Sequence, residues 1–176
     1  TLKGHAVSHE IDVIAAKDNE LLAIECKFRN DIDAKISVTT PMYFRSRLTD
    51  ISNMPYTLFN KTLEVTQGWL VTNAYLTADS KKFGEYYKLN LLSWDYPADN
   101  SIKVRVDNNG EYPITCLTTI DAHDKAQLLK AQFILVKDIL RKPTCLTNTV
   151  RLAENKIEAV LMEARELVNS PLYEHG

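Results

Sequence analysis

The N-terminal part of the chain alternates between short apolar runs and polar breaks, which predicts a β-hairpin followed by a helix. Residues 9–15 are rich in β-branched side chains and predict a strand, and Asp18-Asn19 is typical of a turn. The apolar run 21–28 predicts the second strand of the hairpin. Residues 29–38 are polar and basic and predict a loop, and Pro41 fits the first turn of a helix that ends near residue 53.

The middle of the chain predicts further strands and one helix. The apolar run 68–73 predicts a buried strand. Thr77 can cap a helix over residues 78–88, with Asp79 in the first turn. Residues 91–96 predict a strand, and residues 102–106 alternate between apolar and basic side chains as a half-exposed strand does.

The pattern changes after Thr118. Residues 121–142 and 149–169 are rich in Leu, Ala, Lys and Glu at helical spacing, and Pro143 separates them. We therefore predict the α/β class with two domains, residues 1–117 and a small all-helical C-terminal domain, residues 118–176.

Composition narrows the function classes. Of the 176 residues, 45% are hydrophobic and 25% are charged, as in ordinary globular domains. No apolar run approaches the roughly 20 residues of a membrane-spanning helix, and no signal peptide opens the chain, so we expect a cytoplasmic protein with no membrane partner. The three cysteines form no CxxC pair, which argues against a zinc site and fits reduced thiols. The chain begins with Thr1, so we expect a fragment or a processed product of something longer.

Charged residues on the predicted hairpin are the main candidates for chemistry. Because side chains alternate across a strand, Glu10 and Asp12 share one face, and Glu25 and Lys27 share one face of the next strand. The simplest register of the hairpin brings Asp12 near Glu25 and Lys27. The formal net charge of −2 counts against a general nucleic-acid binder, but a nuclease needs acidic metal ligands and only a local basic patch.

Such a group suits phosphodiester hydrolysis. Asp12 and Glu25 would bind Mg²⁺, which lowers the pKa of a bound water and polarises the phosphate. Lys27 would orient the nucleophile or stabilise the charge of the transition state. The spacing alone is equally compatible with a solvated strand face that carries a cross-strand salt bridge.

The aspartate on one strand and the E-x-K on the next resemble the PD-(D/E)xK nuclease superfamily. The wider context, HEIDVIA and LLAIECKF, resembles its Mrr-like branch, the type IV restriction endonucleases. Residues 40–51 and 68–97 resemble the later helix and strand–helix–strand segments of that branch, so the likeness covers residues 4–97. One departure is that Ile11, not proline, precedes Asp12. Another is that the chain starts too late to show the helix that usually begins the family's core.

The resemblance implies a restriction-endonuclease-like central mixed sheet flanked by helices, and Mg²⁺-dependent cleavage of DNA, with Mn²⁺ as a substitute. It implies that Asp12, Glu25 and Lys27 are catalytic, with Asp12 and Glu25 as the metal ligands. The site-lining candidates are His9, Glu10, Tyr43 and Arg47. Cleavage of both DNA strands by one site per chain implies at least a homodimer. In related proteins this domain can follow a nucleotide-sensing domain, which we expect upstream as a partner.

Basic residues around the predicted helix are candidates for DNA contacts. Lys35, Arg45 and Arg47 lie in a stretch with no acid between Asp33 and Asp50, so they could face phosphates, or form a solvated helix face. The C-terminal helices vaguely resemble a helix-hairpin-helix DNA-binding module, but residues 130–132 occupy its turn without a glycine, which favours a packing role.

A magnesium-dependent endodeoxyribonuclease is the function that these features predict. The alternative is a non-catalytic DNA-binding or regulatory module that retains the nuclease fold. A structural oligomerisation domain would explain the helices but not the charged hairpin.

Overall fold

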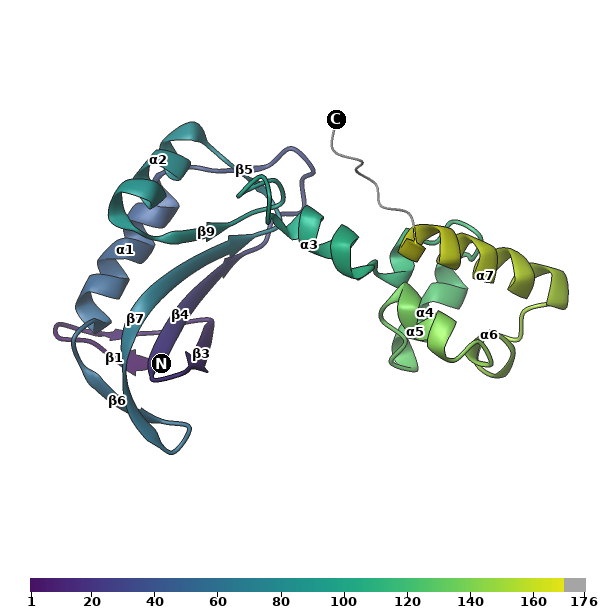
Figure 1. Ribbon diagram of the computed structural model, residues 1–176, viewed down its shortest axis with the longest axis horizontal. Helices are drawn as coiled ribbons and strands as arrows, with labels where there is room; N and C mark the ends of the chain where they lie inside the picture. Colours follow the sequence, from purple (N-terminus) through teal and green to yellow (C-terminus); the bar gives the residue numbers. More distant parts are fainter. Residues whose placement is uncertain (170–176) are drawn as a thin grey trace. The chain divides into compact units, whose positions relative to one another are not determined.

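The computed structural model describes residues 1–169, and the chain divides into two compact units, Thr1–Ile102 and Lys103–Gly176 (Figure 1). The sequence predicted the boundary at residue 118, but the division falls earlier. Tyr112, Ile114 and Leu117 are buried in the core of the C-terminal unit and therefore belong to it. Residues 170–176 of the predicted C-terminal domain lie outside the described residues.

The N-terminal unit is built on a five-stranded mixed sheet, which confirms the predicted α/β class. Its strands run in the order β3-β4-β7-β6, and β9 also pairs with β7. β4 pairs with β3 in antiparallel and with β7 in parallel, and β7 pairs with β6 in antiparallel and with β9 in parallel. The strands are β3 (Val13–Lys17), β4 (Glu20–Lys27), β6 (Pro55–Leu58), β7 (Lys61–Thr72) and β9 (Asn90–Leu92).

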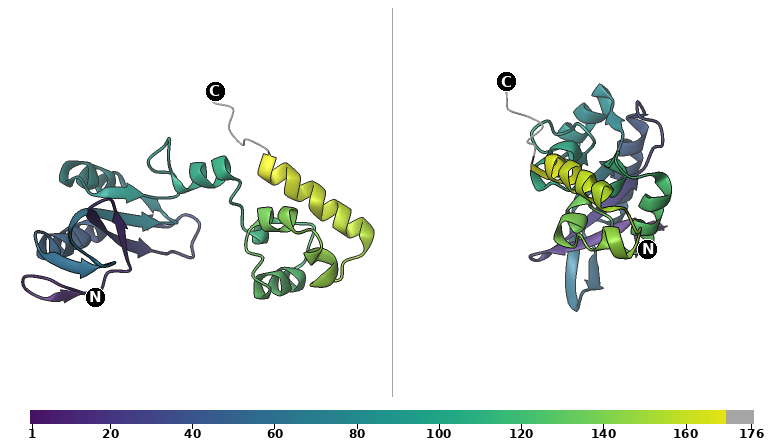
Figure 2. Two further views of the ribbon diagram at one scale, coloured as in Figure 1. Left: turned by 60° about the horizontal axis from the view of Figure 1, so that its bottom comes forward. Right: turned by 90° about the vertical axis from the view of Figure 1, so that its right-hand side faces the viewer.

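Two helices connect the parallel strands and pack side by side against one face of the sheet (Figures 1 and 2). α1 (Thr39–Ile51) lies between β4 and β7 in the chain, and α2 (Ala78–Tyr87) lies between β7 and β9. As predicted, Thr77 caps α2 by accepting a hydrogen bond from the backbone N–H of Ser80. Two short strand pairs complete the unit: β1 (Leu2–Lys3) with β2 (Ser8–His9), and β5 (Lys35–Ile36) with β8 (Tyr75–Leu76).

The core of this unit lies between α1, α2 and the sheet. Phe44, Leu48 and Ile51 follow one another at helical spacing on α1 and are buried against the sheet. Gly68 on β7 lets Leu48 approach the sheet, because a Cβ at this glycine would overlap with Leu48 Cδ1. The close fit between α1 and β7 therefore depends on the absence of a side chain at residue 68.

The structure differs from the predicted elements in several places. The predicted strand 9–15 is broken, since β2 ends at His9 and β3 begins at Val13. The hairpin β6–β7 was not predicted; its turn consists of Phe59 and Asn60, which both have positive φ and so match the right-handed twist of the strands. Within residues 91–96 only the first two are part of a strand, β9.

Residues 102–106 form a helix, not the predicted strand. They belong to α3 (Ile102–Asn109), and Gly110, at φ +58°, follows its last residue in the left-handed conformation that commonly ends helices. The alternation of apolar and basic residues therefore did not indicate a strand here. Asp107–Gly110 forms the end of this helix and not a turn between two strands.

The rest of the C-terminal unit consists of short helices around a core that includes Leu128, Val136, Ile139, Leu146 and Val160. The turn predicted at residues 130–132 is present, with Gln132 at φ +66°. No helix described in residues 1–169 has the length and apolar character that a membrane crossing requires. The elements are η1 (Ile114–Cys116), α4 (Ala122–Lys130), α5 (Val136–Arg141), α6 (Cys145–Asn148) and α7 (Glu154–Asn169).

Glu163 of α7 holds the segment that precedes α4. Its carboxylate accepts hydrogen bonds from the backbone N–H and the hydroxyl of both Thr118 and Thr119. Burial alone would raise the pKa of Glu163, but these hydrogen bonds outweigh it and lower the pKa from 4.5 to about 2.

Substituting Gly68→Ala should destabilise the chain by about 1–3 kcal/mol, the usual effect of overpacking a core. The added methyl would displace Leu48. Urea unfolding measures the loss, with Lys61→Ala, an exposed change in the same strand, as the control that should change stability by less than about 0.5 kcal/mol. Equal stabilities of the two variants would contradict the close fit.

The low pKa of Glu163 makes stability depend on pH. The folded state favours the ionised carboxylate of Glu163. Its contribution to the free energy of unfolding is therefore complete above pH 4.5 and disappears as the pH falls toward about 2. Thermal unfolding followed by circular dichroism should show a fall in melting temperature over this range that is smaller in Glu163→Gln. The same pH dependence in both proteins would show that other carboxyl groups cause the acid instability.

Candidate functional site

Glu25 and Lys27 lie on the same face of β4, as the alternation of side chains predicted. This is the face of the sheet that α1 covers. Leu21, Ala23 and Glu25 are buried on this face, whereas Cys26 is exposed on the other. Only 3% of Glu25 is accessible to solvent. A carboxylate this deeply buried requires charged or hydrogen-bonding partners.

Two cations supply these partners for Glu25. Its Oε1 accepts a hydrogen bond from Lys27 Nζ at 2.6 Å, and its Oε2 accepts one from Arg47 Nη1 at 2.8 Å. The guanidinium of Arg47 also lies over the ring of Tyr43, 5.6 Å from its centroid. The two cations differ in exposure, because the side chain of Arg47 is 10% exposed and that of Lys27 is 33% exposed.

Asp12 is fixed at the same point of the sheet. It precedes β3, next to Val13, which pairs with Ile24. Its Oδ2 accepts a hydrogen bond of 2.7 Å from the backbone N–H of Cys26, the residue between Glu25 and Lys27. The carboxylate of Asp12 is therefore held against the Glu25–Lys27 segment of β4.

The thiol of Cys26 responds to all three charges. Burial raises the pKa of the Cys26 thiol, the carboxylates of Asp12 and Glu25 raise this pKa further, and the ammonium of Lys27 lowers it. All three charges act on this thiol because Glu25 and Lys27 flank Cys26 in the chain and Asp12 accepts its backbone N–H.

Asp12 and Glu25 are the two carboxylates of this site that could hold a metal ion. A carboxylate offers about four lone-pair positions, and the hydrogen bonds described use one position on each oxygen of Glu25 and one on Oδ2 of Asp12. Within residues 1–169 no group of three or more His, Cys, Asp or Glu side chains gathers as a metal site. Two carboxylates with water suit Mg²⁺, whereas zinc is usually held by three or four protein ligands.

His9 and Glu10 are not joined to this group by any hydrogen bond among the described residues. His9 Nε2 instead lies 2.7 Å from Oδ2 of Asp50, near the end of α1. The backbone N–H of Ala6, together with His9, lowers the pKa of the Asp50 carboxyl. His9 thus attaches the β1–β2 hairpin to α1, and Glu10 is exposed.

The basic residues proposed for DNA contact have different surroundings. Lys35 is exposed in β5, and Arg45 is half-buried at a pocket between α1 and β7. Arg47 is buried and bound to Glu25, so its predicted role of lining the site fits this geometry better than a phosphate contact. Two residues apart on a helix, Arg45 and Arg47 point in different directions.

Sequence reasoning did not find the contact between Glu25 and Arg47, although a signal was present. Arg47 follows Phe44 by three residues and precedes Ile51 by four, which places it on the buried face of α1. A charged residue among core positions needs a buried partner, and Glu25 is the acid on the strand that α1 covers.

Two residues at the end of β7 that the sequence did not single out support the end of β4. The hydroxyl of Thr72 donates a hydrogen bond of 2.6 Å to the carbonyl of Lys27. The amide of Asn73 accepts from the N–H of Arg29 and donates to its carbonyl. The backbone on both sides of Phe28 is therefore attached to β7.

Comparisons with known proteins show relatives along most of the chain. Residues 112–168 match the family model described as AF1548-like, C-terminal. An uncharacterized protein of Archaeoglobus fulgidus is 29% identical over 167 residues, which are 95% of this chain and 90% of the relative. The crystal structure of AF1548, described as a protein of unknown function, matches with a TM-score of 0.61 and 29% identity over 95% of this chain and 85% of that one. The chain is thus similar to AF1548 in sequence and fold, and its activity has to be inferred from the site.

The two cations at Glu25 should contribute unequally to stability. Arg47→Met should destabilise the chain by about 3 kcal/mol, because it removes one partner of a buried carboxylate. Lys27→Met should destabilise it by about 1 kcal/mol, since its ion pair is partly solvated. Denaturant unfolding of both variants, each repeated with Glu25→Gln to give a double-mutant cycle, measures the two couplings. A larger loss for Lys27→Met would contradict this order.

Proposed function

We propose that this chain is a Mg²⁺-dependent nuclease that hydrolyses phosphodiester bonds in DNA. The observation that carries the proposal is the buried carboxylate of Glu25 on β4. It accepts a hydrogen bond from Lys27, and the backbone of Cys26 between them donates one to Asp12. Two acids and one lysine at one point of a sheet are the groups that metal-assisted phosphoryl chemistry requires.

Each residue of the site has a role that follows from its surroundings. Asp12 and Glu25 would hold the metal, which when bound polarises the phosphate and lowers the pKa of a bound water. Lys27, the more exposed of the two cations, would stabilise negative charge that develops on the phosphate. Arg47 acts through Glu25, because it fixes the direction of that carboxylate from the buried side.

The position of the site in the sheet supports the proposal. β4, β7 and β9 run in parallel, so their carboxyl ends meet at one edge, which is where Lys27 and Thr72 lie. Ligand sites of open α/β sheets occur at this edge. A hairpin that carries D and E-x-K, followed by a helix and a parallel strand, also agrees with the resemblance to the PD-(D/E)xK superfamily and its Mrr-like branch.

The partners and location predicted from the sequence belong to this proposal. DNA is the substrate, and cleavage of both strands would require at least two copies of the chain, each with one site. An upstream nucleotide-sensing domain and a cytoplasmic location remain predictions of the resemblance and the composition.

A non-catalytic module is the second candidate, and one observation favours it. Both oxygens of Glu25 are in ion pairs, with Lys27 and with Arg47. Such a buried network can exist for the fold alone, since an acid between two cations is electrostatically satisfied without a metal. In that case the fold would bind DNA or regulate an attached domain.

Plasmid cleavage separates the two candidates. With Mg²⁺ or Mn²⁺ the parent should nick or linearise supercoiled DNA. The cleavage rate should fall at least about 100-fold in each of Asp12→Asn, Glu25→Gln and Lys27→Met, because each change removes a metal ligand or a charge-stabilising group. Lys61→Met, an exposed change on β7, is the control and should retain full activity. DNA binding with equal absence of cleavage in all five proteins would support the non-catalytic module.

Metal binding can be measured without cleavage. Mg²⁺ or Mn²⁺ should raise the melting temperature of the parent, because a ligand that binds only the folded state stabilises it. Asp12→Asn should abolish this shift while retaining a folded spectrum, since its carboxylate is exposed. A shift of the same size in Asp12→Asn would remove Asp12 from the ligand set.

A further inference from the structure

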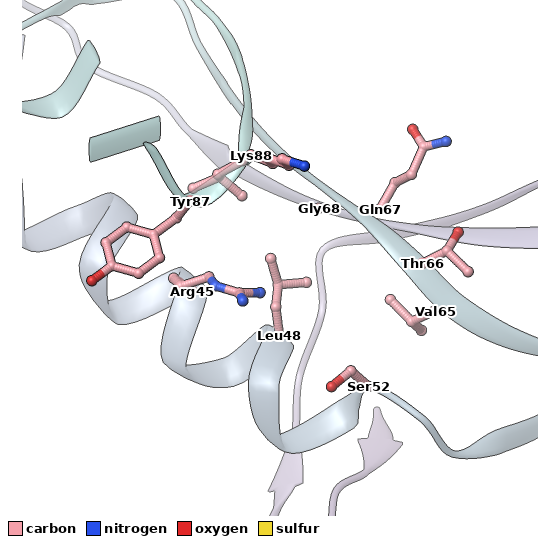
Figure 3. Close-up of a pocket in the computed structure, with 10 residues that line it drawn as sticks. Arg45, Leu48, Ser52, Val65, Thr66, Gln67, Gly68, Tyr87 and Lys88 are labelled. Carbon is pink, nitrogen blue, oxygen red and sulfur yellow. The ribbon is translucent and has the colours of Figure 1, made fainter. Parts of the chain in front are cut away.

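A small pocket lies between α1, β7 and the end of α2 in the N-terminal unit (Figure 3). Its volume is about 60 Å³, which is more than a single water needs. None of the residues of the proposed nuclease site lines it. The lining residues are Arg45, Leu48, Ser52, Val65, Thr66, Gln67, Gly68, Tyr87, Lys88 and Leu89.

Two cations reach this pocket and no acid lines it. Arg45 extends from α1 with its guanidinium beside Leu48, and Lys88, just after α2, extends its ammonium toward Gly68 on β7 (Figure 3). Among residues 1–169 neither has a carboxylate within salt-bridge distance, although nearby Arg47 and Lys81 are each paired with one. Two cations that line one small pocket without an acid make its potential positive.

The backbone conformation of Lys88 determines where its side chain lies. Lys88 has φ +53° and ends α2 in the left-handed conformation, with its N–H directed to the carbonyls of Glu85 and Gly84. Glycine or asparagine is favoured at such a position, so the backbone does not account for a lysine there. The turn does, however, bring the lysine side chain to the mouth of the pocket.

The floor of the pocket is an interruption in the pairing of β7. β6 pairs with β7 only as far as Glu64, and β9 begins to pair at Trp69. Between them, Val65–Gly68 have a neighbouring strand on the β4 side alone. The exposed Thr66 therefore borders the pocket, whereas the carbonyl of Gly68 accepts a hydrogen bond from Asn90 and the amide of Gln67 donates one to Glu20.

We propose that this pocket binds a phosphate group through Arg45 and Lys88. A guanidinium offers paired N–H donors that match phosphate oxygens, and an ammonium adds a point charge. The size of the pocket suits one tetrahedral anion, which is either a free or terminal phosphate or one phosphodiester of a nucleic acid. The inference does not rest on the proposed nuclease activity.

Titration with inorganic phosphate in the presence of a metal chelator and at low chloride tests the site. Backbone amide signals of Thr66 and Gly68 in NMR spectra should shift to saturation. Arg45→Gln and Lys88→Asn should each weaken binding about tenfold, as expected when one charge-assisted hydrogen bond is lost. Asparagine tolerates the left-handed conformation, so Lys88→Asn preserves the end of α2.

Lys82→Gln is the matched control, because it removes an exposed charge from the same helix but does not line the pocket. It should bind phosphate as tightly as the parent. No saturable shift in the parent, or equal affinity in the parent, Arg45→Gln and Lys88→Asn, would overturn the proposal.

A second arm identifies the source of the phosphate. Short thymidine oligonucleotides with and without a 5′-phosphate are titrated into Glu25→Gln and into Glu25→Gln combined with Arg45→Gln. Tighter binding of the phosphorylated oligonucleotide, lost with Arg45→Gln, assigns a terminal phosphate. Equal binding of both, weakened by Arg45→Gln, assigns a phosphodiester. Because the assay needs neither metal nor cleavage, an inactive nuclease site would leave its outcome unchanged.

Discussion

The burial of one carboxylate determines much of the N-terminal unit. Glu25 lies among the apolar residues of β4, where an isolated charge would be strongly unfavourable. It is tolerated because α1 supplies Arg47 and β4 itself supplies Lys27. This requirement fixes the rotation of α1 about its axis, since Arg47 must reach Glu25 while Phe44, Leu48 and Ile51 stay in the core. The same constraint places the proposed site, the core and the helix in one arrangement.

The sequence predicted what depends on local patterns. Alternation on β4 correctly placed Glu25 and Lys27 on one face, and the chemistry of Thr77 correctly marked the start of α2. The patterns failed where long-range packing decides. Residues 102–106 alternate like a strand but form a helix whose Val106 packs with the C-terminal core. The spacing of Arg47 places it on the buried face of α1, but its pairing with Glu25 depends on how α1 crosses the sheet.

The two basic residues of α1 illustrate how a helix separates functions. Both Arg45 and Arg47 were predicted to contact DNA as members of one basic stretch, and Arg47 was also predicted to line the site. In the structure one neutralises a buried acid and the other lines a pocket without one. Both depend on the same close contact of α1 with the sheet, which Gly68 permits by leaving room for Leu48. Packing at a single glycine thus supports both proposed sites.

The hydrogen bonds of Thr72 and Asn73 have a mechanical consequence for the segment after β4. They bind the backbone at Lys27 and Arg29 to the end of β7, so both points move only with that strand. A change in the conformation of residues 30–34 would therefore have to begin after Arg29. The backbone that carries the ammonium of Lys27 would therefore keep its position on the sheet while the loop after it changes conformation.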